Sequence, residues 1–313
     1  MSKLKISYLV TVHNEDTSLD KCITTIVTHK DDEDEIIVLD DFSDNPKTQE
    51  ILQRWKYAAK ISMIFPTGTI EKTPNVRVMQ HALDKNYGGH KNFGNEQCTG
   101  DWIFQIDGDE IPNPNLIINL KTIIESNPNA DLIYVPRIND FIGVTPEHAA
   151  KWGWRLTPCD ACEGRPVVNW PDYQSRIYKR NDKIRWDRRL HEKIEGHNEF
   201  VTIPAETDLA LYHDKTIETQ VKTNVRYNEW FSAEENQGHN VFDKTIPPRK
   251  FQDTLVKYQI ESIDHNTVVF SVNSLSATMK IGELVGMDKM TVRPQSIENI
   301  DGKYRITANI INK

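Results

Sequence analysis

Apolar and polar residues alternate in blocks along the first 140 residues of the chain. Leu4 to Val12 and Glu35 to Leu39 are runs of β-branched and apolar residues, which is typical of strands buried on both faces of a parallel sheet. Between these runs, five apolar residues recur at helical spacing, namely Leu19, Cys22, Ile23, Ile26 and Val27. The pattern predicts a strand, a helix and a second strand.

The same blocks continue along the chain. Helices are predicted over Thr48 to Ala59, His90 to Cys98, Leu116 to Glu125 and Thr216 to Ala233, and strands over Ile61 to Phe65, Asp101 to Ile106 and Leu132 to Pro136. Strands that alternate with helices indicate parallel strands joined by right-handed crossovers, with Ile61 to Phe65 as the third strand. We therefore expect an α/β fold with a mostly parallel, Rossmann-like sheet flanked by helices.

The second half of the chain is less regular. Residues 137 to 175 are aromatic and proline-bearing, and short strands are predicted at Arg176 to Tyr178, near Lys193 and at Leu209 to Tyr212. Pro247 and Pro248 mark a break, after which strands are predicted at Val268 to Val272 and Tyr304 to Ile310. We expect one domain over residues 1–246 and a small C-terminal extension over residues 247–313.

Composition narrows the function classes. The 38 basic and 46 acidic residues give a net charge of -8, which excludes a uniformly basic surface for nucleic acid. No signal-peptide pattern and no apolar run of about 20 residues is present, so we expect no stable membrane insertion and a cytoplasmic protein. Cys159 and Cys162 form a lone pair at this spacing, which supports a structural role rather than a zinc site.

Polar clusters directly follow three of the predicted strands, at residues 13–16, 40–44 and 107–110. In an open parallel sheet, ligands bind beyond the carboxyl ends of the strands. The three clusters should therefore meet along one edge of the sheet, which makes that edge the candidate site.

Asp107-Gly108-Asp109 has the composition of a cation site. Two carboxylates separated by a glycine can share Mg²⁺ or Mn²⁺, which can then bridge a diphosphate and neutralise its charge as it leaves. The alternative is an Asp-Gly turn at the surface. Its place after a buried strand, beside two further polar clusters, favours the metal site. His213 follows a strand and could complete the metal shell as a neutral imidazole.

Other residues suggest nucleotide binding and proton transfer. Asp40 and Asp41 could accept hydrogen bonds from a nucleobase or from ribose, while Ser43 or Asp44 could cap the next helix. The segment from residue 176 to residue 193 holds eight basic and three acidic residues, either as a solvated face or as a basic wall for phosphates. Two carboxylates are candidate general bases for an acceptor hydroxyl, Asp172 and Glu192.

Short motifs in a fixed order carry a family resemblance over about residues 4 to 230. They are Val10 to Glu15, Val38 to Asp44, Lys91 to Gly94, Thr99 to Trp102, Ile106 to Glu110, Tyr134 to Arg137, Arg176 to Arg180, Leu190 to Glu192 and Leu211 to His213. This ordered set resembles the family 2 glycosyltransferases of the GT-A fold, close to the group that adds sugars to lipopolysaccharide cores.

The resemblance implies roles for individual positions. Thr11 and Glu15 would line the nucleotide site, and Asp41 would hold the base, usually uracil. Asp107 would face ribose or metal-bound water, while Asp109 would ligate the metal. Two further residues would lie near the phosphates or the sugar of the donor, namely Lys91 and Asn92. The family is generally inverting, so the chain is expected to be a metal-dependent inverting glycosyltransferase that uses a UDP-sugar donor.

The acceptor remains open between two classes. One is a hydroxyl of a saccharide, such as a lipopolysaccharide core. The other is hydroxymethylated DNA, as in phage DNA-modifying glycosyltransferases, in which case the protein would work in the cytoplasm of the host. The target base would then flip out of the stack. Aromatic residues could stack on it or form a wall around an acceptor sugar, namely Trp152, Trp154, Trp170, Tyr173 and Trp186. The acidic net charge disfavours DNA.

Two other classes compete with sugar transfer. A nucleotidyltransferase would need a glycine-rich, phosphate-binding loop after the first strand, where this chain has His13-Asn14-Glu15. The other class is a non-catalytic module that binds sugar or nucleic acid.

Overall fold

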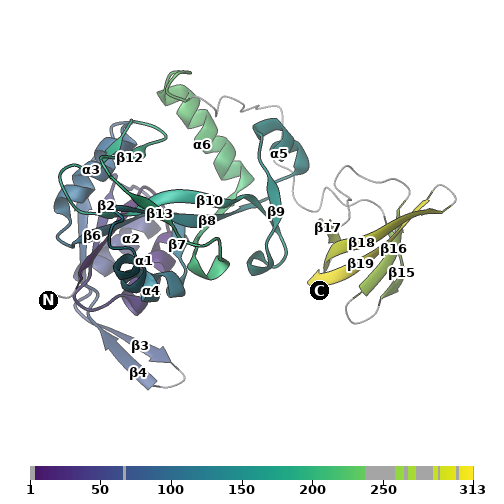
Figure 1. Cartoon of the computed structure of the whole chain (residues 1–313), viewed down its shortest axis with the longest axis horizontal. Coiled ribbons are helices and arrows are strands. Elements are labelled where there is room, and N and C mark those ends of the chain that lie inside the picture. The colour runs from purple at the N-terminus through teal and green to yellow at the C-terminus, as the bar shows by residue number, and fades with distance from the viewer. Residues whose placement is uncertain are drawn as a thin grey trace. The chain divides into compact units, whose positions relative to one another are not determined.

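The computed structural model describes residues 4–65 and 68–236 and, in the C-terminal part, residues 258–263, 267–272, 285–287, 290–300 and 303–312. Figure 1 shows the helices and strands of the chain. By its contacts the chain divides into two compact units. The first comprises Met1–Ile138, Pro171–His213 and Asn228–Gln237, and the second comprises Asn139–Trp170, Asp214–Tyr227 and Gly238–Lys313. The predicted boundary between residues 246 and 247 lies outside the described residues.

Four parallel strands form one side of the main sheet, in the order β5-β2-β1-β6. They are β1 (Ile6–Val12), β2 (Glu35–Asp40), β5 (Val76–Gln80) and β6 (Trp102–Asp107). The helices between them are α1 (Thr17–His29), α2 (Pro46–Tyr57) and α3 (Tyr87–Gln97). This arrangement confirms the predicted α/β class with a Rossmann-like parallel core.

The prediction that Ile61 to Phe65 is the third parallel strand is wrong. That segment is β3 (Ile61–Phe65), and it pairs antiparallel with β4 (Gly68–Lys72) in a separate two-stranded sheet. The strand that pairs with β2 is β5, which lies within the stretch expected to be loop. The strand that this apolar run forms pairs locally in a hairpin. Such a run identifies a strand without identifying its partner.

Beyond β6 the main sheet becomes mixed. The path continues as β10-β8-β14-β7, with β13 beside β8 and β9 beside β10. β10 runs antiparallel to β6, and β14 runs antiparallel to β7. Much of the stretch from residue 137 to residue 175, expected to be irregular, is therefore regular structure. The elements of this part are β7 (Glu110–Pro112), α4 (Pro114–Ser126), β8 (Leu132–Ile142), α5 (Pro146–Trp152), β9 (Leu156–Pro158), η1 (Asp160–Cys162), β10 (Pro166–Lys179), β11 (Arg185–Asp187), β12 (Lys193–Glu195), β13 (Phe200–Thr202), η2 (Thr207–Leu209), β14 (Leu211–Thr216) and α6 (Ile217–Trp230).

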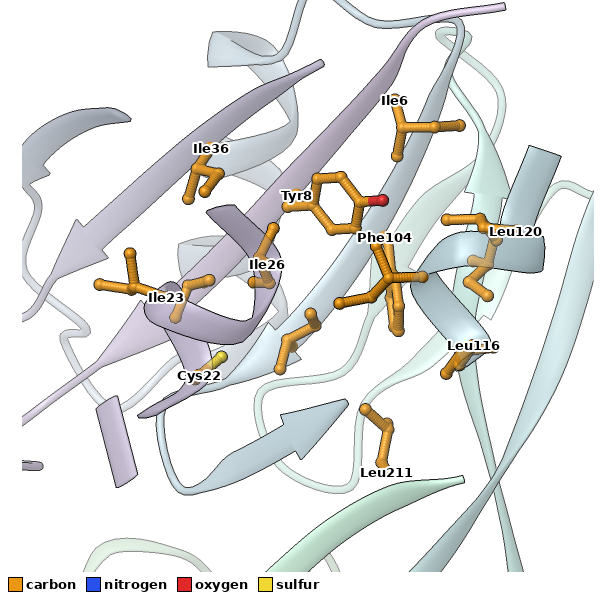
Figure 2. Close-up of a cluster of buried hydrophobic side chains, with 14 of the residues drawn as sticks. Ile6, Tyr8, Cys22, Ile23, Ile26, Ile36, Phe104, Leu116, Leu120 and Leu211 are labelled. Atoms are coloured by element: carbon orange, nitrogen blue, oxygen red, sulfur yellow. The ribbon is translucent and has the colours of Figure 1, made fainter. Parts of the chain in front are cut away.

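Helices cover both faces of the parallel strands, because successive side chains of a strand point to opposite faces. Tyr8 of β1 packs with residues of α1 and α4, as Figure 2 shows for Ile23, Ile26 and Leu120. Leu9 points to the other face, where α3 packs so closely that a Cβ on Gly94 would come within 2.7 Å of the Leu9 side chain. Burial on both faces fixes the strand ends, and with them the polar clusters that follow.

The C-terminal strands form a sheet of their own, in the order β15-β16-β19-β18-β17. The bounds are β15 (Tyr258–Ile263), β16 (Thr267–Val272), β17 (Val285–Met287), β18 (Met290–Ile300) and β19 (Lys303–Asn312). The strands predicted near residues 268–272 and 304–310 are confirmed as β16 and β19. Among the described residues, no helix has the length and apolar composition that crossing a bilayer requires.

Candidate active site

The polar clusters after β1, β2 and β6 meet at one edge of the sheet. The Asp41 backbone N–H donates to the Val12 carbonyl over 2.9 Å, and the Gly108 N–H donates to the Thr11 carbonyl over 2.8 Å. Since β1 lies between β2 and β6, its end joins the other two. The predicted convergence of the three clusters is confirmed.

Asn14 ties the first cluster to the second. Its backbone N–H donates to Ser43 Oγ over 2.9 Å, its side-chain oxygen accepts from the N–H groups of Asp44 and Asn45, and its amide donates to Asp44 Oδ1. Its φ of 58° is one that asparagine tolerates better than most residues. The prediction that Ser43 or Asp44 caps α2 is wrong, because Asn45 is the cap and those two side chains bond Asn14 instead.

The carboxylate of Asp107 is held on both oxygens. Oδ2 accepts from Arg176 Nη2 over 2.6 Å, and Oδ1 accepts from Gln105 Nε2 over 2.8 Å and from Thr11 Oγ1 over 3.1 Å. Burial alone would raise the pKa of Asp107, but the charges of Arg176 and Lys91 outweigh it and hold this pKa well below its usual range. Asp107 is therefore an ionised anchor within the site.

Asp109 and His213 face each other across β7 and β14. His213 Nε2 lies 3.1 Å from Asp109 Oδ2, and their side chains are 8% and 28% exposed. The pairing follows from register, because His213 lies opposite Glu110 in the antiparallel pair of β14 and β7. Among the described residues, no three side chains of His, Cys, Asp or Glu gather closely enough to form a metal site by themselves. The two residues predicted as metal ligands, Asp109 and His213, are therefore in contact with each other.

The residues predicted to bind the nucleotide lie along the same edge. Asp41 Oδ1 accepts from the Leu83 N–H over 2.8 Å, and Asp41 Oδ2 lies 3.6 Å from His13 Nδ1. Thr11 contacts Asp107 as described, and Glu15 accepts from Ser18 over 3.3 Å in the turn that begins α1. Asp41 therefore joins β2 to the segment after β5, while its role toward a base stays a prediction.

Lys91 contacts both Asp107 and Glu192, and Asn92 is the next residue of α3. Lys91 Nζ is 2.6 Å from Glu192 Oε1 and 3.3 Å from Asp107 Oδ1. Asn92 bonds the backbone of Trp186 through both atoms of its amide, over 2.8 and 2.9 Å. The side chain of Asn92 is thus committed to the protein, and its predicted contact with the donor stays untested.

Asp172, the other candidate base, belongs to a buried ion network. Arg137 donates through Nε and Nη2 to Asp172 Oδ2 over 3.0 and 2.6 Å. Arg137 Nη1 also donates to Glu110 Oε1 over 2.9 Å, and Arg176 Nη2 lies 2.6 Å from the same oxygen. Glu110 thereby connects the two arginines, and Arg176 continues to Asp107. In the sequence, Glu110 belongs to the polar cluster at residues 107–110 and Arg176 to the basic segment, but neither pattern predicted their pairing or the contact of Arg137 with Glu110.

The aromatic candidates for stacking separate into different environments. Trp186 is 5% exposed, and its Nε1 donates to the Tyr178 hydroxyl over 3.0 Å, so it offers no open face to a base. The expectation of stacking is wrong for this residue. Trp152 and Trp154 are partly buried in a cluster of the second unit, and Tyr173 donates to the Ile203 carbonyl over 3.0 Å.

Comparison with known families assigns the chain to a class. The model of glycosyl transferase family 2 matches residues 7–198, which include most of the residues described above. Because the match covers more than half of the chain, this protein belongs to glycosyl transferase family 2.

Particular relatives are more distant. The chain is 22% identical over 224 residues to glycosyltransferase SunS of Bacillus phage SPbeta and to the SPbeta prophage-derived SunS of Bacillus subtilis (strain 168). The aligned region is 70% of this chain but only 42% of each relative, so the chain spans about two fifths of their length.

Solved structures of S. aureus TarS resemble the chain broadly in fold. TarS 1–349 is 14% identical with a TM-score of 0.42, covering 76% of this chain and 70% of that one. Its complex with UDP-GlcNAc is 15% identical, with the same TM-score and a coverage of 76% and 71%.

Proposed function

We propose that this chain is an inverting glycosyltransferase that moves a sugar from a uridine diphosphate donor to an acceptor hydroxyl. The observation that carries the proposal is the meeting of Thr11, Asp41 and Asp107 at adjacent strand ends, with the Asp109–His213 pair beside them. Membership of family 2 supports sugar transfer as the reaction. The uridine follows from the resemblance that assigned Asp41 to the base.

The chain's own residues are arranged to bind the donor in one orientation. Asp41 can accept from the imide N–H of uracil, since carboxylates bind such donors well. Asp107 is already paired with cations, so it can accept from ribose hydroxyls without adding net negative charge beside the diphosphate. Binding of this kind orients the anomeric carbon for attack along the line of the leaving phosphate.

A divalent cation fits the Asp109–His213 pair. A carboxylate oxygen and an imidazole nitrogen are ligands that Mn²⁺ accepts, and Mg²⁺ or Mn²⁺ in phosphate sites commonly uses few protein ligands and completes its shell with phosphate oxygens and water. Asp109 and His213 supply one ligand of each kind. When bound, such an ion would offset the charge that develops on the departing diphosphate.

We propose Glu192 as the base that takes the acceptor proton. Glu192 contacts Lys91, which also contacts Asp107, so Glu192 is close to the donor end of the site. Asp172 is connected to Asp107 through Arg137, Glu110 and Arg176. The loop that carries Glu192 is strained, because His191 and Arg188 have φ values of 51° and 72°. Such strain costs free energy and is concentrated at functional sites. Asp172 is the alternative base.

We propose a saccharide hydroxyl as the acceptor. The net charge of -8 opposes binding to a DNA backbone. The burial of Trp186 also removes one of the residues that could stack on a flipped base.

A donor panel tests the proposal. Full-length protein is incubated with UDP-, GDP- and CMP-sugars, with and without Mn²⁺, and with either oligosaccharide or hydroxymethylated DNA. We expect release of UDP and a glycosylated saccharide of inverted anomeric configuration. Release of pyrophosphate would indicate a nucleotidyltransferase, and tight binding without turnover would indicate a binding module. Glycosylated DNA would redirect the acceptor assignment.

A further inference from the structure

Lys91 lies buried between the two ends of the candidate site. It belongs to α3, its side chain is 4% exposed, and its ammonium contacts Glu192 Oε1 at 2.6 Å and Asp107 Oδ1 at 3.3 Å. One cation thus touches both the proposed base and a carboxylate of the donor end. Any change in its position or charge reaches both groups.

The surroundings of Lys91 leave it little freedom. Its Nζ lies 4.6 Å from the centroid of the Trp186 ring, within the range of a cation–π contact. The indole is itself fixed by the Tyr178 hydroxyl, and the Trp186 backbone is bonded on both sides by Asn92, the next residue of α3. The ammonium therefore lies against side chains that the protein itself holds in place.

The same helix supports the loop of Glu192. The Tyr87 N–H, at the start of α3, donates to the Arg189 carbonyl over 2.9 Å. A Cβ at Gly88 would come within 2.3 Å of the Arg188 carbonyl oxygen, so the loop packs directly on the helix backbone. α3 therefore fixes both partners of the Lys91–Glu192 pair.

We propose that Lys91 is a positioning residue that places its positive charge beside the Glu192 carboxylate and aims that carboxylate at the acceptor hydroxyl. The inference rests on the proposed function and on Glu192 as its base. A positive charge beside a carboxylate favours the ionised form. Asp107 also contacts the Lys91 ammonium, and its negative charge partly offsets the effect of the lysine charge on Glu192. The resemblance gave Lys91 another role, contact with the donor phosphates, and the two roles predict different kinetics.

The pH dependence of turnover separates the two roles. Glu192 contacts Lys91 of α3, which also contacts Asp107 of β6, and its charged neighbours in sequence are Arg189, His191 and Lys193. Loss of the lysine charge makes a neighbouring carboxylate easier to protonate. Because a general base works only when it is deprotonated, the acid limb of the pH profile of kcat then moves to higher pH. A lysine that only binds phosphate would raise the KM for the donor without moving that limb.

The experiment compares full-length wild type with Lys91→Met (K91M) and Lys91→Gln (K91Q), measuring kcat and donor KM between about pH 5 and pH 9. For both variants we expect the acid limb of kcat to move up by about one pH unit, with donor KM changed by less than about threefold. Lys91→Arg (K91R), which keeps the charge, should retain the wild-type limb. K91Q can still hydrogen bond with Glu192, so it gives the result if K91M does not fold.

Lys121→Met (K121M) is the matched control, because Lys121 is also a partly buried lysine paired with carboxylates, Asp31 and Asp34, outside the site. Its acid limb should match that of wild type. An unmoved limb in folded K91Q, or a donor KM raised more than about tenfold with an unmoved limb, would overturn the positioning role.

Turnover by the wild-type and Glu192→Gln (E192Q) enzymes distinguishes failure of the proposed function from failure of the base assignment or of the role of Lys91. No transfer by wild type with any donor would remove the proposed function itself. Full turnover by E192Q would remove only the base assignment and the inference built on it. With wild type active and E192Q inactive, an unmoved limb in the lysine variants counts against Lys91 alone.

Discussion

Arg176 and Glu110 form an ion pair inside the sheet, with Nη2 of the arginine 2.6 Å from Oε1 of the glutamate. The Glu110 side chain is fully buried, and that of Arg176 is 4% exposed. Burial would lower the pKa of Arg176, but the charges of Asp107 and Glu110 outweigh it and raise this pKa above its usual value. Arg176 therefore stays charged, and through Asp107 and Glu110 it fixes the end of β6.

Removal of the Glu110 charge should destabilise the protein strongly. Glu110→Gln (E110Q) leaves two arginines facing one buried amide, and breaking a buried pair from one side costs about 3–5 kcal/mol. We expect the free energy of unfolding, measured with urea, to fall by this amount. Glu71→Gln (E71Q) breaks an exposed pair with Lys60 and should cost less than about 1 kcal/mol. Equal losses in the two variants would contradict the importance of the buried network.

Asp109 should be needed for metal-dependent turnover and not for folding. Its side chain is 28% exposed and contacts His213. We expect Asp109→Ala (D109A) to reduce Mn²⁺-stimulated UDP release by at least about 100-fold, because charge on the leaving group is no longer offset. Thermal unfolding should shift little, and Asp182→Asn (D182N), at an exposed surface position, serves as the control. Unchanged activity of D109A would remove the proposed metal site.

Substitution of the two candidate bases, Glu192 and Asp172, should lower kcat to different extents. E192Q and Asp172→Asn (D172N) keep the shape of each side chain and remove its basicity. Loss of a general base lowers the rate by about 10²–10⁴-fold, and we expect that loss in kcat for E192Q, with donor KM nearly unchanged. D172N should retain kcat within about tenfold, since it mainly alters the pair with Arg137. The reverse order of the two losses would make Asp172 the base.

Glu35 should make stability depend on pH. Burial would raise its pKa, but hydrogen bonds from Ser7 and Thr99 outweigh it and lower the pKa from 4.5 to about 2. A carboxyl with a lowered pKa stabilises the fold fully above its unfolded value, and this stability is lost as pH falls through the folded value. The shift corresponds to up to about 3 kcal/mol.

We therefore expect Glu35→Gln (E35Q) to be less stable than wild type at pH 7, with the difference shrinking between about pH 5 and pH 3 in urea titrations. Glu50→Gln (E50Q), at an exposed position of α2, should show no such convergence. A constant difference between E35Q and wild type across this range would contradict the assignment.

The positions of strands and helices were largely predictable, because buried faces require apolar residues at a regular spacing in the sequence. The five apolar residues of α1 are all fully buried, and β1, β2 and β6 carry the polar clusters as expected. β3 shows the limit of this reasoning. Its apolar run pairs with the next strand, while β5, in which Arg77 interrupts the apolar residues, completes the parallel core. Pairing depends on tertiary contacts that a short window does not contain.

The site was predictable where residues follow strands directly, and less so where charges pair across the sheet. Arg137 and Arg176 lie far from Glu110 in the sequence and reach it only because β8 and β10 join the sheet beyond β6. A usable signal was present, since each arginine interrupts or begins an apolar strand segment. A buried strand tolerates such a charge only with a partner.

The place of β10 next to β6 has a consequence for how the protein emerges from the ribosome. A nascent chain that ends before residue 176 contains β1, β2 and β6, together with the partners Lys91 of Asp107 and Arg137 of Glu110. It lacks Arg176, the one guanidinium among the described residues that contacts both Asp107 and Glu110. Completion of the nucleotide end is thereby coupled to synthesis of the second half of the domain, and no early fragment carries a finished binding edge.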